Sequence, residues 1–142
     1  METKVAFREK IAWIALLGSL IADGVYFGIL WVHGGRPDHG YFVGLFLEII
    51  LVQAIISIVA TIAVAIISAA DARLPRDERD RLIERMAAGR AYYPLLIGIV
   101  LAAASYHLGI GVFGMLNILL AVIMLAEALR FGFQIIAYRR GG

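Results

Sequence analysis

Four long apolar runs, separated by short polar connections, dominate this chain. A helix rises ~1.5 Å per residue and the hydrocarbon core of a bilayer is ~30 Å thick, so runs of this kind are typical of transmembrane helices. The pattern predicts an all-α membrane protein, with four transmembrane helices in an antiparallel bundle that forms a single domain over residues 1–142. The predicted spans cover residues 11–32, 41–70, 91–106 and 112–138.

The most charged stretch, residues 71–90, lies between the second and third runs and holds six of the thirteen basic and five of the eleven acidic residues. We interpret it as a charged hairpin leading into the third span, where Pro94 is expected within the first turn or two. The hairpin is either a solvated helical elbow or a surface for a cytoplasmic partner or anionic lipid, and its net charge of only +1 argues against a simple polybasic lipid patch. The candidate partner-binding residues are Asp77, Glu78, Arg79, Asp80, Arg81 and Glu84.

Composition supports a membrane protein, because 62% of the residues are hydrophobic, 17% are charged and the mean hydropathy is +0.88. Four spans leave no room for a separate soluble catalytic domain. The sequence contains no Cys, and no nucleophile with a base, no metal motif and no phosphate loop is recognisable. We therefore predict no enzyme, no catalytic residues and no cofactor.

The distribution of Lys and Arg predicts the orientation of the spans. Twelve of the thirteen lie in the N-terminal segment, the hairpin and the end of the last run, and the only other one is Arg36. Cytoplasmic loops are enriched in Lys and Arg, so both termini and the hairpin are predicted to be cytoplasmic. Trp13 and Trp31 bracket the first run like interfacial anchors, which favours a retained span over a signal peptide. The net charge of +2 then reflects topology, and no nucleic-acid partner is expected.

Two carboxylates inside the spans form the first candidate site. Asp23 and Glu48 are expected ~10 to 14 Å below the outer surface, and each costs about 2.5–3.5 kcal/mol to insert at a helix centre. Two carboxylates in one dry site cannot both ionise cheaply, so with Asn117 they are a candidate proton or cation site. Alternatively they stay apart, since Glu48 points away from the small polar face from Gln53 to Ser68, and Asn117 forms a hydrogen bond between helices.

Glu127 and Arg130 form a candidate inner polar pair in the last span. They are three residues apart and can pair within the helix, while Arg130 can extend toward the surface. We interpret them as a local salt bridge rather than part of a transport path. His33, His39 and His107 lie in or beside the outer loops without the spacing of a metal motif, so no metal site is predicted.

Two Gly-x-x-x-Gly patterns fit close helix packing in lipid. They start at Gly24 and Gly40 and end at Gly28 and Gly44. They support a homodimer as one hypothesis, beside contact with the lipid bilayer and with a protein partner at the hairpin.

One resemblance adds to this interpretation. The run from Asp77 to Glu84, with Arg90 and Tyr92 following it, resembles a signature of small bacterial four-span membrane proteins classed as domains of unknown function. The opening from Phe7 to Trp13 is similar to the start of the same group. The resemblance implies the bacterial inner membrane and transfers no functional residue.

Two functions from different classes follow from these observations. The first is a non-enzymatic structural or regulatory membrane module whose charged hairpin engages a partner. The alternative is a small proton-coupled or cation-coupled transporter or channel that uses the intramembrane carboxylates. Only the second requires Asp23 and Glu48 to share a cavity.

Overall fold

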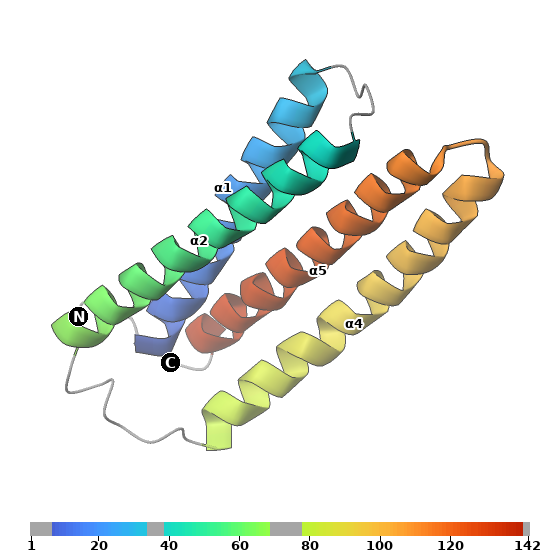
Figure 1. Ribbon diagram of the computed structural model, residues 1–142. Coiled ribbons are helices and arrows are strands. Elements are labelled where there is room, and N and C mark those ends of the chain that lie inside the picture. The colour runs from blue at the N-terminus through green and yellow to red at the C-terminus, as the bar shows by residue number, and fades with distance from the viewer. Residues whose placement is uncertain (1–6, 34–38, 69–77, 141–142) are drawn as a thin grey trace.

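A computed structural model describes residues 7–33, 39–68 and 78–140. These residues form four helices, which are labelled α1, α2, α4 and α5 in Figure 1. Each is long and apolar enough to cross a membrane, so the prediction of an all-α protein with four helices of membrane-spanning length is confirmed. The helices are α1 (Phe7–Val32), α2 (His39–Ile67), α4 (Glu78–His107) and α5 (Val112–Arg140).

Apolar side chains on the outside of these helices are compatible with an integral membrane protein. Helix α2 is the clearest case, because no residue in its most apolar 18-residue window is buried. Side chains such as Leu51, Ile56 and Val59 are about 60% exposed along it. A continuous apolar surface of this length is too costly to leave in water and matches the hydrocarbon core of a bilayer.

Helix α4 extends well beyond the third predicted span. It begins at Glu78 rather than near Ala91, so the second half of the charged stretch and the span form one continuous helix. Good helix formers fill this segment, and Glu78 and Asp80 in the first turn favour the helix dipole. Pro94 was expected in the first turn or two of the third span, but the helix begins well before that span. Pro94 is in the helix interior and leaves the carbonyl of Arg90 without its helical N–H donor.

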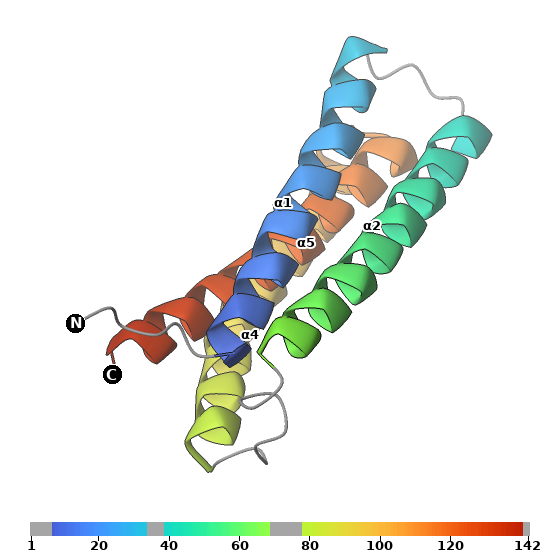
Figure 2. The same cartoon turned by 90° about the vertical axis from the view of Figure 1, so that its left-hand side faces the viewer.

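The helices pack in a definite order. Helix α1 packs against both α2 and α5, and α4 packs most closely against α5. Figures 1 and 2 show the α1/α2 pair and the α4/α5 pair joined along α1 and α5. We call the two ends of the assembly the terminal end and the turn end. The terminal end holds Phe7, Ile67, Glu78 and Arg140, and the turn end holds Val32, His39, His107 and Val112.

Close backbone approach explains the tight contact between α4 and α5. A Cβ added to Gly98 would lie 2.8 Å from Cγ2 and 3.1 Å from Cβ of Val122, so only a glycine fits there without a shift of the partner. The flanking α4 residues on the same face, Ala91 and Ala102, are 5% and 1% exposed. Small residues thus let these two helices gain dispersion contacts without a hydrophobic driving force.

The turn between α4 and α5 is closed by backbone hydrogen bonds. Gly109 has a φ of 84°, a conformation that glycine adopts at little cost. The amides of Leu108 and Ile110 both donate to the carbonyl of Ser105, at 3.1 and 3.2 Å. This capped turn fixes the start of α5 next to the end of α4.

Candidate functional site

A polar network at the terminal end joins the four helices. It starts from three consecutive polar residues in the first turn of α1. Successive helix residues point about 100° apart, so the three side chains can reach three different neighbours. Arg8 Nε lies 2.7 Å from Asp80 Oδ2 of α4, Arg139 Nε of α5 donates to Glu9 Oε1 at 2.9 Å, and Lys10 Nζ donates to Ser68 Oγ, just after α2, at 3.2 Å.

Glu9 is the buried member of this network. Its side chain is 8% exposed, whereas that of Arg139 is 62% exposed. The guanidinium of Arg139 also lies 5.4 Å from the centre of the Trp13 ring, within the range of a cation–π contact. A buried carboxylate is tolerated when a hydrogen-bonded counter-charge accompanies it, so Arg139 is what makes Glu9 compatible with its position.

Asp80 of α4 interacts with side chains of α1 and α5. Its pair with Arg8 is largely shielded, with side-chain exposures of 24% for Arg8 and 21% for Asp80. Tyr138 of α5 is also close enough to Asp80 and Glu84 to interact with both electrostatically. Two of the candidate hairpin residues, Asp80 and Glu84, therefore face other helices and not a free surface.

The opposite side of the same segment is open. Ile83, Ala87 and Ala91 are buried, so the first turns of α4 lie with one face against the bundle. We call the other side the outward face of α4. It consists of the exposed residues Arg79, Arg81, Leu82, Arg85 and Met86.

The outward face of α4 differs from the predicted hairpin surface in composition. Leu82 is 57% exposed and Met86 is 48% exposed, and both lie among arginines. Glu78 is exposed at the start of α4, four residues before Leu82 and so on the same side, and takes part in an interaction of its own. Asp77 lies outside the described residues. The exposed surface is thus basic and partly apolar, while the acidic residues Asp80 and Glu84 are turned inward.

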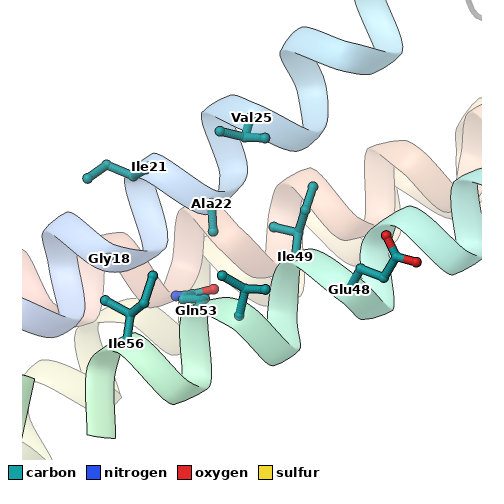
Figure 3. Close-up of a pocket in the computed structure, with 9 residues that line it drawn as sticks. Gly18, Ile21, Ala22, Val25, Glu48, Ile49, Gln53 and Ile56 are labelled. Carbon is teal, nitrogen blue, oxygen red and sulfur yellow. The ribbon is translucent and has the colours of Figure 1, made fainter. Parts of the chain in front are cut away.

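Glu48, but not Asp23, lines a groove between α1 and α2. The groove has a volume of about 360 Å³, and Glu48 and Gln53 belong to its lining. Figure 3 shows Glu48 at one end of the groove, with its carboxylate directed away from Gln53. Asp23 is not part of this lining; the α1 residues that face the groove are Gly18, Ile21, Ala22 and Val25.

Asn117 is engaged in a hydrogen bond between helices. The hydroxyl of the buried Tyr26 on α1 donates to Asn117 Oδ1 at 2.9 Å, and Asn117 Nδ2 donates to the carbonyl of Phe113 at 2.9 Å. The Tyr26 ring packs edge-on against Phe46 of α2, with ring centres 5.7 Å apart. The structure therefore brings Asn117 to Tyr26, near the turn end, and not to Glu48.

The Glu127 and Arg130 side chains pair within α5. Arg130 Nη2 lies 2.7 Å from Glu127 Oε2, and the guanidinium lies 4.6 Å from the centre of the Phe131 ring. His33 Nδ1 makes a hydrogen bond of 2.9 Å with the carbonyl of Ile29. Within residues 7–33, 39–68 and 78–140, no three His, Asp or Glu side chains are grouped closely enough to hold a metal ion.

Three of the four glycines in the Gly-x-x-x-Gly patterns make no close helix contact within the chain. A Cβ placed on Gly24, Gly28 or Gly44 would meet no atom within 4 Å. This contrasts with Gly98, whose hydrogen faces Val122. Gly24 and Gly28 are exposed on the surface of α1.

The chain was compared with protein-family models, with curated proteins and with solved structures. None of these comparisons found a match, so the assignment of function depends on the geometry described above.

Proposed function

We propose that this chain is a structural or regulatory membrane module that engages a protein partner through the outward face of α4. The observation that carries the proposal is the division of one helical segment into two faces. One face is fixed to the bundle through Asp80, Ile83 and Ala87, and the other presents exposed arginines beside exposed Leu82 and Met86. A segment held rigidly on one side can bind without first paying the cost of ordering.

The chemistry of the face indicates the kind of partner. Arginine and methionine are common in protein interfaces, and arginine binds carboxylates through two parallel hydrogen bonds. Arg79 and Arg85 therefore fit acidic side chains, while Leu82 and Met86 fit an apolar strip between them. We infer a partner segment that is acidic and amphipathic, from a cytoplasmic or membrane protein.

The proposed setting completes this hypothesis. We place the chain in a bacterial inner membrane, with antiparallel spans and with both termini and the start of α4 in the cytoplasm, because the basic residues gather at that end. A homodimer through Gly24 and Gly28 is compatible with the same arrangement, since those glycines lie on a different helix from the outward face of α4.

Site-specific photo-crosslinking in the native membrane tests the proposal. A photoreactive residue at position 82 should give a discrete adduct with a protein partner, because this position lies at the centre of the outward face. The same residue at position 100, where Val100 is 65% exposed among apolar neighbours, is the matched control and should give lipid adducts only. The adduct at position 82 should be lost in the double variant Arg79→Glu and Arg85→Glu.

Two results would contradict the module hypothesis. One is an adduct at position 82 that persists unchanged after both charge reversals. The other is a cellular phenotype that depends on Asp23→Asn but not on the reversals at Arg79 and Arg85. A restored adduct after compensating Lys substitutions in the partner's acidic residues would support the inferred charge pairing.

The transport alternative is favoured by one observation, the placement of Glu48 beside an apolar groove between α1 and α2. On this hypothesis Glu48 alone carries the proton or cation, since Asp23 faces elsewhere. Proteoliposomes should then show a proton or cation flux that Glu48→Gln abolishes and Asp23→Asn leaves intact. A flux no greater than that of empty vesicles would exclude this alternative.

A further inference from the structure

A second groove lies between α4 and α5 near the terminal end of the molecule. Its volume is about 640 Å³. It shares Met86 with the outward face of α4, but its other lining residues lie outside that face, so a ligand here does not require the arginines proposed to bind the protein partner. Gly89 leaves space in its wall, because a Cβ there would meet no atom within 4 Å. The lining residues are Met86, Gly89, Arg90, Tyr92, Tyr93 and Phe133.

Arg90 is the one ionisable charge among these lining residues, and its guanidinium is oriented by an aromatic ring. The Cζ atom of Arg90 lies 5.9 Å from the centre of the Phe133 ring of α5, within the range of a cation–π contact. A guanidinium that lies over a ring keeps its N–H groups free at the edge of its plane. The groove thus presents oriented donors and a single positive charge.

The position of Arg90 along α4 matches the boundary of a bilayer. Arg90 ends the charged segment, and the next sixteen residues, 91–106, include no Asp, Glu, Lys or Arg. Tyr92 and Tyr93 follow after Ala91, are both exposed, and have ring centres 5.9 Å apart. Tyrosines of this kind are enriched at the level of lipid headgroups, so the guanidinium is expected at the depth of the phosphates.

We propose that this groove is a binding site for an anionic phospholipid, with the phosphodiester on Arg90 and the lipid's glycerol and upper acyl chain against Met86 and Phe133. Guanidinium matches phosphate oxygens through paired, charge-assisted hydrogen bonds. The tyrosine hydroxyls add neutral donors for a polar headgroup. The lining includes no carboxylate that could pair with an ammonium group, which favours an anionic headgroup over a zwitterionic one.

Native mass spectrometry of the full-length protein in detergent tests this site. Phosphatidylglycerol and phosphatidylcholine with identical acyl chains are titrated separately, and inorganic phosphate is added as a competitor in a third arm. We expect one phosphatidylglycerol adduct to bind more tightly than phosphatidylcholine, and Arg90→Gln to weaken it about tenfold, as for the loss of a charge-assisted hydrogen bond. Arg90→Lys should retain the charge but only part of the affinity, because it loses the paired geometry.

Matched variants separate this site from general charge attraction. Arg85→Gln removes an exposed arginine from the same helix but outside the groove, and it should leave the adduct unchanged. Phe133→Leu keeps Arg90 and removes the ring beneath it, and should weaken binding to a smaller extent. Thermal unfolding of each variant verifies that the protein is folded.

Several outcomes would overturn the proposal. Equal affinity for the two lipids, an unchanged adduct in Arg90→Gln, or equal losses in Arg85→Gln and Arg90→Gln would each show that no specific anionic lipid site exists here. Displacement of the lipid by millimolar inorganic phosphate would assign the groove to a free anion instead.

Discussion

The two ends of this molecule are held together by different forces. At the terminal end, charged groups join the helices, and the Arg8–Asp80 and Glu9–Arg139 pairs connect α1 to α4 and α5. At the turn end, aromatic rings pack together and a hydrogen bond from Tyr26 to Asn117 joins α1 to α5. The rings are those of Tyr26, Phe27, His33, Tyr41, Phe42, Phe46 and Phe113.

This difference has a physical explanation in the surroundings of each end. Removing a charged pair from water costs free energy, and this cost is smaller when the remaining N–H groups can bind water. Arg139 meets this condition, because its side chain is 62% exposed. The neutral hydrogen bond and the ring contacts at the turn end carry no such penalty, whatever the polarity of their surroundings. The terminal end should therefore respond to charge substitutions and to salt, and the turn end should respond to changes of shape.

The largest loss of stability is expected from a substitution between the two ends, where α4 and α5 are in close contact. Gly98→Val would force a branched side chain against Val122, and overpacking of this kind costs about 1–3 kcal/mol. Both ends should lose stability together, seen as a lower thermal midpoint and faster hydrogen exchange throughout α4 and α5.

A matched control sharpens this test. Gly132→Val is made on α5, where an added Cβ would meet nothing within 4 Å, and should change the midpoint far less. The second substitution Val122→Ala should restore part of the loss caused by Gly98→Val. A variant Gly98→Val as stable as the parent protein would show that the helices are not in close contact here.

The next largest effect is expected from the buried carboxylate at the terminal end. Glu9→Gln leaves Arg139 without its counter-charge, but because Arg139 is largely exposed, we expect a loss of about 1–2 kcal/mol rather than the 3–5 kcal/mol of a fully buried pair. Hydrogen exchange should accelerate at the terminal end of α1 and remain unchanged near Tyr26. The coupling energy comes from a double-mutant cycle with Arg139→Gln, and a value near zero would contradict the pairing.

At the turn end, Tyr26→Phe removes the hydroxyl and leaves the ring contacts in place. Hydrogen bonds between membrane helices are worth about 0.6 kcal/mol on average, with a maximum of about 1.7 kcal/mol, and we expect a loss in this range. Tyr106→Phe, at an exposed position near the same end, is the control and should have no effect. Asn117→Leu is then made both in the parent protein and in the Tyr26→Phe variant. If it lowers stability by the same amount in both backgrounds, the two side chains are not coupled.

The helices of this fold could be predicted from the sequence, because long apolar runs have few alternatives in lipid. The third span was predicted from Ala91, whereas the helix that contains it begins at Glu78. The residues from Glu78 to Arg90 include many charged side chains, which excludes them from an apolar span, but their helix propensity is high and is compatible with the helical elbow that was one of the two interpretations. Polarity therefore indicates where the apolar span begins, and propensity indicates where the helix begins.

The polar network could not be predicted from spacing, because its partners are far apart in the chain. Arg8 and Asp80 are separated by 72 positions, and five acidic residues of the charged stretch were equivalent candidates for such a pair. A signal was nevertheless present in three consecutive polar residues, Arg8, Glu9 and Lys10, at the start of an apolar helix. Such a triplet indicates that the helix end has neighbours on several sides.

The smallest expected effect is that of salt, and it tests most directly whether charge holds the terminal end together and not the turn end. Raising the salt concentration from ~0.1 to ~1 M shortens the Debye length from ~10 to ~3 Å, which weakens a partly exposed pair such as Arg8–Asp80. We expect a loss of about 0.2–1 kcal/mol, measured as faster hydrogen exchange at the start of α4, with no change around Tyr26 and Asn117. The double variant Arg8→Gln and Asp80→Asn removes both charges and should lose most of this salt response. An equal response at both ends, or an unchanged response in the double variant, would mean that salt acts on the whole bundle and that the terminal end is not held by charge.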